Sequence, residues 1–243
     1  MSGEGETDIY GSAWTYESIV GAFPLPGIDL SERALAPIQF AVFEAGVLLF
    51  AALTDAWGAV LPGTAAVLVA TGGSVLMTRI ATDVRSRDLP DTYRRLLFGA
   101  NIETVLAVFA FVSMVVYLFS YDPARRTPGL LTELVGPDPG MVVLFFALLL
   151  LWDVCYRIAA GWWIAATSLW RSWRYDYGST TARTLRRADA ATAAFGGLQL
   201  VLVPFASGHP EVVASLVAHA VALALFTGGS ALLLTRQVRA AEN

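Results

Sequence analysis

Five ionisable side chains and one amide interrupt long apolar stretches of this sequence, where polar groups are rare. An ionisable group at membrane depth costs about 2.5 to 3.5 kcal/mol on insertion scales, so each one is treated as a functional hypothesis. No catalytic, cofactor-binding or metal-binding residue is assigned. The candidate intramembrane polar site consists of Glu44, Glu103, Asp153, Arg157, Gln199 and His219.

Asp153 and Arg157 are four residues apart in one apolar segment. On a helix this spacing puts both side chains on the same face, within reach of an ion pair. A self-contained pair lowers the cost of insertion, although Arg157 has the length to snorkel toward the membrane surface. The spacing favours a structural pair that turns one helix face toward its neighbours.

Glu44 and Glu103 have no basic neighbour on their own segments. Each must be protonated, pair with Arg157 or His219 across the bundle, or line a wet cavity, because an isolated buried carboxylate becomes neutral. Protonated carboxyls would join helices by hydrogen bonds, whereas carboxylates in a wet cavity would conduct a proton or a small ion. The sequence leaves both readings open and favours the first.

Composition excludes several classes of protein. The chain has 243 residues, of which 56% are hydrophobic and only 15% charged, and its formal net charge is -4. All 16 basic residues are arginine, and the acidic balance excludes a basic nucleic-acid binder. The single cysteine and two histidines give no zinc or H-E-x-x-H pattern, and no nucleophile motif or phosphate-binding loop occurs.

The apolar stretches predict the elements that position these residues. A transmembrane helix needs about 20 apolar residues to cross a hydrocarbon core of roughly 30 Å. We therefore expect an all-α, polytopic membrane bundle, with an acidic, aromatic N-terminal segment (residues 1–33) before a six-helix transmembrane domain (residues 34–243). The expected spans are residues 34–54, 57–78, 96–121, 141–164, 190–207 and 212–235.

Arginine distribution predicts the orientation. Loop arginines are retained on the cytoplasmic side of a membrane. In a six-span arrangement, thirteen of the 16 arginines fall on one side, only Arg125 and Arg126 fall on the other, and Arg157 lies within a span. This segregation predicts a protein of the cell membrane with both termini in the cytoplasm.

A short motif occurs twice at the same end of the expected bundle. TGGS stands at residues 71–74 and again at residues 227–230, each followed by an apolar run and an arginine. With weaker similarity between the first and third spans, this suggests three repeated helical hairpins. Chance matching in apolar sequence is the alternative. A true repeat would place Glu44, Glu103 and Gln199 in a ring.

The N-terminal segment has its own pattern. It opens with Glu4, Glu6 and Asp8, and an aromatic and aliphatic set follows, which fits either the lipid interface or packing under the bundle. Asp29 and Glu32 have the spacing of a capping box before the first span. No cleavable signal is expected, because residues 1–32 contain no basic residue.

Three further stretches carry a family resemblance. They are WTYESIVG at residues 14–21, YRRLLFG at residues 93–99 and LWDVCYR at residues 151–157. Together with the lysine-free, acidic composition, they resemble an uncharacterised multi-span membrane protein family of halophilic archaea. The resemblance implies no activity, and it transfers no functional residue.

Three functions remain after these exclusions. The first is a small transporter or channel that uses the intramembrane carboxylates to move a proton or small ion. The second is a structural or accessory scaffold subunit whose polar residues serve helix packing, with a second copy or another membrane protein as its partner. An intramembrane enzyme has the least support, so we expect a non-enzymatic protein that needs no cofactor and binds the lipid bilayer but no nucleic acid.

Overall fold

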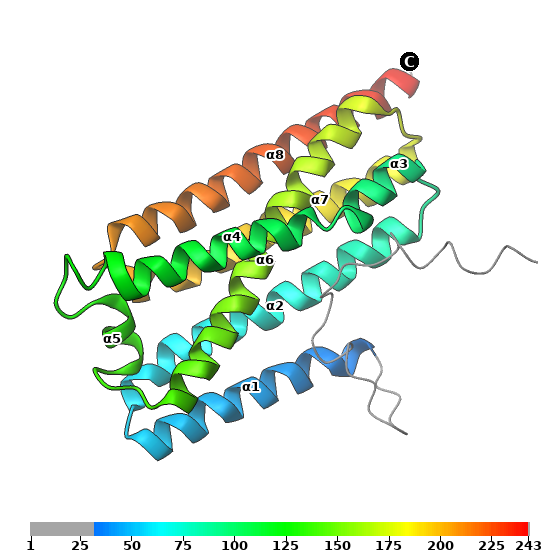
Figure 1. Ribbon diagram of the computed structural model, residues 1–243. Coiled ribbons are helices and arrows are strands. Elements are labelled where there is room, and N and C mark those ends of the chain that lie inside the picture. Colours follow the sequence, from blue (N-terminus) through cyan, green and yellow to red (C-terminus); the bar gives the residue numbers. More distant parts are fainter. Residues whose placement is uncertain (1–31, 243) are drawn as a thin grey trace, which may run out of the picture.

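The computed structural model describes residues 32–242, and this part of the chain is helical without strands (Figure 1). The two capping-box positions and the N-terminal aromatic set were predictions for residues 1–33. All of these except Glu32, the first residue of α1, lie outside the described residues. The long helices are α1 (Glu32–Thr54), α2 (Val60–Arg85), α4 (Ile102–Val116), α6 (Met141–Arg174), α7 (Ser179–Gln199) and α8 (Pro210–Glu242).

Short helical segments complete the spans or join them. Two are π-helical, at either end of α4, and two are 3-10 segments, before α2 and after α7. The short segments are η1 (Trp57–Ala59), α3 (Asp91–Arg94), η2 (Arg95–Gly99), η3 (Tyr117–Tyr121), α5 (Leu130–Val135) and η4 (Leu200–Ala206).

Six helical stretches are long and apolar enough to cross a membrane, which confirms the predicted all-α bundle of six spans. They are Ala36–Thr54, Trp57–Arg85, Asp91–Tyr121, Met141–Arg174, Ser179–Ala206 and Pro210–Ala240. Most of them extend further than predicted at the end where the arginines gather. This end is called the arginine end below, and the opposite end, which carries α5, is called the α5 end (Figure 1).

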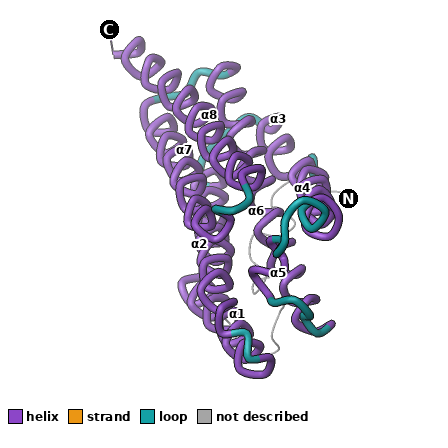
Figure 2. Tube along the Cα trace, turned by 90° about the vertical axis from the view of Figure 1, so that its left-hand side faces the viewer, coloured by secondary structure: helices purple, strands orange, loops and turns teal. Residues whose placement is uncertain are grey.

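Helix α6 crosses the bundle obliquely and packs against α2, α4, α7 and α8 (Figure 1). Figure 2 shows α7 and α8 running side by side, with α1 at one edge of the bundle. Helix α1 packs mainly on α2. The six spans therefore form a packed group around α6, and α1 is attached at its periphery.

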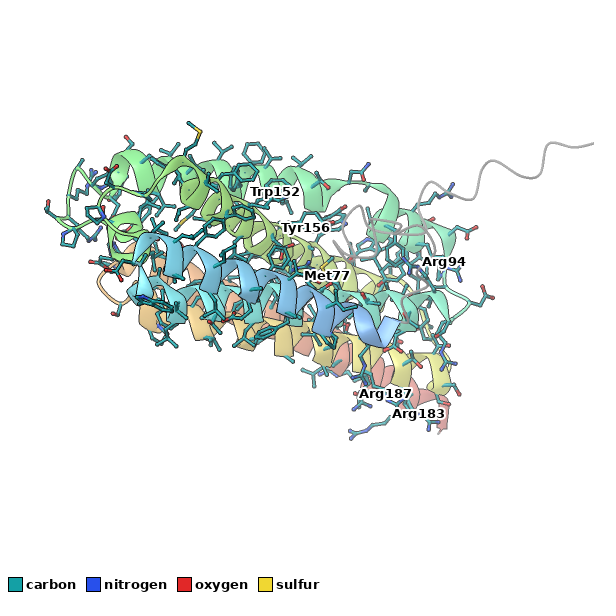
Figure 3. The ribbon with its side chains drawn as sticks, turned by 90° about the horizontal axis from the view of Figure 1, so that it is seen from below. Met77, Arg94, Trp152, Tyr156, Arg183 and Arg187 are labelled. Carbon is teal, nitrogen blue, oxygen red and sulfur yellow. The ribbon has the colours of Figure 1, made fainter. Side chains whose placement is uncertain are left out.

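The buried core is richest toward the arginine end. Small residues let the helix backbones approach closely there, and Ala81, Ala160 and Ala182 are each fully buried. Tyr93 and Leu97, from α3 and η2, fill the space between α2, α6 and α7. Figure 3 shows Met77, Trp152 and Tyr156 gathered where α6 passes α2.

The two TGGS motifs occupy different environments. In α2, Gly73 and Ser74 are buried inside the bundle, whereas in α8 Gly228 is exposed and a Cβ there would meet nothing within 4 Å. The motif in α2 is therefore a packing notch, whereas in α8 Gly228 is exposed and Thr227 and Ser230 are buried. The three-hairpin repeat stays a prediction.

Candidate functional site

Asp153 and Arg157 form a buried ion pair on α6. The Nε atom of Arg157 donates to Oδ2 of Asp153 at 2.9 Å, and Nη2 donates to Oδ1 at 3.0 Å. Nη1 lies 3.6 Å from the Sδ atom of Met77 on α2. The Arg157 side chain is 0% exposed. This two-point geometry fixes the guanidinium and gives each charge a partner within one helix.

A glycine of α2 makes room for Arg157. A Cβ on Gly73 would lie 2.5 Å from Cδ of Arg157 and 2.8 Å from a ring carbon of Phe195. Any larger residue would therefore push α2 away from α6 and α7. The conformation of the buried arginine depends on this close approach of backbones.

Glu44 lies half-buried between α1 and α2. The hydroxyl of Thr64 donates to its Oε1 at 2.8 Å, and Oε2 has no partner in the described part of the chain. This single hydrogen bond joins α1 to the helix that it packs on. The contact is the interhelical kind expected of a packing group.

Glu103 is wholly buried in the first turn of α4. The preceding Asn101 has φ 51°, in the left-handed region, where the chain turns from η2 into α4. Thr104 donates a long hydrogen bond of 3.5 Å to Oε1 of Glu103, and Oε2 is unpartnered within residues 32–242. Glu103 is thus the least satisfied carboxyl of the predicted set.

Gln199 and His219 are also buried without hydrogen-bond partners in the described structure. Both amide atoms of Gln199 lack one at the end of α7, where the chain continues into η4. His219 on α8 is 5% exposed, and neither ring nitrogen has a partner. Its ring lies 6.2 Å from that of Trp162, measured between centroids.

The structure brings together only one pair of the six predicted residues. Asp153 and Arg157 are joined, but no described hydrogen bond or ion pair connects Glu44, Glu103, Gln199 or His219 to one another. Helix α1, with Glu44, lies at the edge of the bundle, away from α4, with Glu103 (Figure 1). A common carboxylate ring is not part of the observed geometry.

A second buried ion pair, which the sequence did not reveal, lies at the arginine end. Nη2 of Arg171 on α6 donates to Oδ1 of Asp189 on α7 at 2.6 Å, and Nη1 donates to Tyr93 and Ser168 at 3.0 Å and 2.6 Å. Ser230 of α8 donates to the other oxygen of Asp189 at 2.6 Å. The pair therefore ties α3, α6, α7 and α8 together.

Arg171 lies within α6 and is 1% exposed, because this helix continues to Arg174, beyond the expected span of residues 141–164. By contrast, Arg183 and Arg187 are exposed on α7 and extend away from the ribbon (Figure 3). Arg79 and Arg236 are exposed although they follow apolar runs just as Arg171 does, so no signal in the sequence marks Arg171 as buried.

A polar cluster that sequence reasoning also missed closes the α5 end. Nδ1 of His209 lies 2.9 Å from Asp122, and Nε2 lies 3.2 Å from Glu133. With both ring nitrogens protonated, this histidine can donate to both carboxylates. The guanidinium of Arg126 donates to Glu211 at 2.8 and 3.0 Å and to Asp122 at 3.0 Å. These contacts join η3, the following loop, α5 and the start of α8.

Asp122 is the centre of this cluster. Burial would raise the pKa of its carboxyl, but hydrogen bonds from the Leu130 N–H, His209 and Arg126 outweigh burial and lower the pKa to about 2, from an ordinary value of 3.8. The Leu130 N–H donates at 2.6 Å from the first turn of α5. The carboxylate therefore holds the short helix in place and stays charged at neutral pH.

An apolar cavity of about 700 Å³ lies next to this cluster. It runs between α1, α2, α6 and α8, with the end of α4, η3 and α5 at one end and His219 in its wall. Glu44, Glu103 and Asp153 do not line it. In the part of the chain that the structure describes, no group of three His, Cys, Asp or Glu side chains is arranged to hold a metal ion.

Comparison with known proteins identifies the family to which this chain belongs. A model described as a family of unknown function (DUF7530) matches residues 9–230. No curated protein and no solved structure matches the chain. Because the family model spans most of the sequence, and the structure is a helical bundle with six apolar spans, this chain is an integral membrane protein that belongs to DUF7530.

Proposed function

We propose that this protein is a non-enzymatic scaffold or accessory subunit of a membrane assembly. The carrying observation is that the two buried aspartate–arginine pairs are each satisfied locally and stand apart from the cavity. Asp153 is bound by Arg157, and Asp189 is bound by Arg171. Neither pair lines the cavity, whose walls are almost entirely apolar. Such pairs hold helices in one register and offer no continuous polar path.

Transport by the intramembrane carboxylates is the second candidate. Glu103 favours it, since this carboxyl is wholly buried and one of its oxygens has no partner among the described residues. A carboxyl in this state can take up and release a proton if water reaches it. The distance of Glu103 from the cavity lining and from the Glu44 helix weighs against a shared pathway.

For the location we propose the cell membrane, with both termini and the arginine end in the cytoplasm. The support is the distribution of arginine, which is concentrated at one end of the bundle, with Arg125 and Arg126 alone at the other among residues 32–242. The absence of lysine and the acidic balance of the sequence support an origin in a halophilic archaeon.

Two measurements on the same variants separate the scaffold from the transporter. Glu44→Gln and Glu103→Gln remove the titrating group and keep the shape of the side chain, and Asp138→Asn at an exposed loop position is the control. The proteins are reconstituted in vesicles containing a pH-sensitive dye, and proton flux is recorded under an imposed gradient. In parallel, membranes are treated with a cross-linker, and species heavier than one chain are identified.

The scaffold predicts that wild-type vesicles leak protons no faster than protein-free vesicles, and that a second copy or a distinct membrane protein is cross-linked. Flux that is present in the wild type, unchanged in Asp138→Asn and lost in Glu103→Gln would refute the scaffold and establish the carboxylate pathway. A chain that is recovered alone, without cross-linked species, would also contradict the proposal.

A further inference from the structure

His219 is an unsatisfied polar group in the wall of a largely apolar cavity. It is nine residues beyond Pro210, the first residue of α8, which puts it roughly 14 Å along the helix at about 1.5 Å per residue. That is close to the middle of a hydrocarbon core of about 30 Å. A neutral imidazole has one donor and one acceptor, and both lack partners within the described structure.

Leaving both of these groups unpaired is costly at this depth, because lipid offers no hydrogen bond in exchange. The neighbouring residues do not provide a hydrogen bond to the imidazole either. The Trp162 ring packs near the imidazole at 6.2 Å between centroids, and the hydroxyl of Ser215, one turn away, donates to the backbone oxygen of Glu211. The structure therefore places an unpartnered hydrogen-bonding side chain in the cavity wall, where a molecule in the cavity can satisfy it.

The volume and the lining of the cavity indicate the chemistry of the rest of such a molecule. Its volume of about 700 Å³ falls within the roughly 300 to 1,000 Å³ of small-molecule sites. Four phenylalanines line it and offer faces for a flat ring, while the remaining lining is largely aliphatic. These are Phe43, Phe50, Phe146 and Phe205.

The route of entry also indicates an apolar ligand. Val42 and Phe146 line the cavity and are also 62% and 41% exposed, so the space reaches the side of the bundle that faces lipid. At the α5 end, the cavity is bordered by Leu130 of α5 and by Tyr117, which belongs to the polar cluster around Asp122. Lateral entry from the membrane selects molecules that already dissolve in lipid.

We propose that this cavity binds a lipid-soluble quinone or aryl ketone, with its carbonyl oxygen accepting a hydrogen bond from the His219 imidazole. The flat ring packs among the phenylalanines, and an alkyl or prenyl tail fills the aliphatic part of the cavity. Binding at this site is independent of the scaffold role. It goes beyond that role because the Asp153–Arg157 and Asp189–Arg171 pairs do not line this cavity.

Binding is tested on the full-length protein in lipid nanodiscs, with a decyl-substituted benzoquinone as the probe and decylbenzene, which lacks the carbonyls, as the matched control. Tryptophan quenching is titrated, and Trp162→Phe identifies the signal from the ring next to His219. We expect saturable quenching by the quinone and at least about tenfold weaker binding in His219→Leu, because one buried hydrogen bond is lost. His219→Gln, which keeps an N–H donor, should lose less, and decylbenzene should bind both proteins alike.

A second pair of variants tests the place of binding. Gly46 lines the cavity, and a Cβ there would meet nothing within 4 Å, so Gly46→Phe fills the space. Gly228→Phe is the control, since Gly228 is equally open but does not line the cavity. Quinone binding should be abolished in the first variant and unchanged in the second.

Three results would overturn the proposal. They are quenching that never saturates in the wild type, equal quinone affinity in the wild type and His219→Leu, and wild-type affinity in Gly46→Phe. If Gly46→Phe does not fold, as judged by its elution and helix content, the two His219 variants still decide the question.

Discussion

Replacing Arg171 with methionine should destabilise the bundle more than replacing any exposed arginine. The substitution keeps much of the apolar stem but removes the charge that faces Asp189 at 2.6 Å. The Asp189 carboxylate, which is 1% exposed, would then keep its hydrogen bond from the Ser230 hydroxyl but lose its counter-charge. Breaking one side of a buried ion pair in this way costs about 3 to 5 kcal/mol.

The matched control is Arg183→Met, because Arg183 lies at the same end of the bundle but is exposed and bonds only within its own helix. A surface change of this kind stays within about 0.5 kcal/mol. For a chain of this size, about 2 to 4 °C of melting temperature corresponds to 1 kcal/mol, so Arg171→Met should melt about 6 to 20 °C lower and the control within about 2 °C.

A double variant isolates the charge effect. Arg171→Met combined with Asp189→Leu removes both charges, and replacing a buried pair by apolar residues is often close to neutral. We expect the double variant to recover most of the lost stability. Thermal unfolding in detergent, followed by circular dichroism, gives the melting temperatures of the wild type, Arg171→Met, Arg183→Met and the double variant. Equal melting of Arg171→Met and Arg183→Met, or a double variant less stable than the single, would refute the reasoning.

Three further outcomes are expected. The pKa of Asp122 lies below its ordinary value, so its stabilising contribution is present above about pH 4 and is lost as the pH falls toward about 2; the melting-temperature difference between wild type and Asp122→Asn should shrink over that range. Gly73→Ala should cost about 1 to 3 kcal/mol in chemical denaturation through overpacking, whereas Gly228→Ala should not destabilise. A membrane-impermeant maleimide should label Asp138→Cys on intact cells but Ser86→Cys only after permeabilisation.

For each of these predictions, one result would contradict the reasoning. A stability difference at Asp122 that persists unchanged to the lowest pH would mean that its carboxyl is not held in the charged form by the cluster. Equal stability of the two alanine variants would mean that α2 can move away from Arg157 without loss. Labelling of both cysteines from the outside would overturn the orientation, and the native Cys155 does not interfere because it is buried.

The spans and the Asp153–Arg157 pair were predictable because both depend on local spacing. Hydropathy over about 20 residues identifies a membrane helix, and a separation of four residues puts two side chains on one face of it. The pairing of Arg171 with Asp189 was not predictable in the same way. These residues lie on different helices, and only the crossing of α6 and α7 brings them within 2.6 Å.

The cavity and the cluster at the α5 end depend still more on tertiary packing. Asp122 and His209 are separated by two complete spans, and their contact of 2.9 Å requires these spans to pack in the bundle. His219 was identified from the sequence as a buried polar residue, but its place in the wall of a cavity follows from the positions of six helices. Sequence periodicity carries no information about the space that packed helices leave between them.

Helix α6 has 34 residues and is therefore roughly 51 Å long, against a hydrocarbon core of about 30 Å. Both buried arginines, Arg157 and Arg171, belong to it, and Cys155 and Ile158 on the same helix line the cavity. The cavity wall and the ion pair to Asp189 at the arginine end are therefore parts of one continuous helix that extends across the hydrocarbon core.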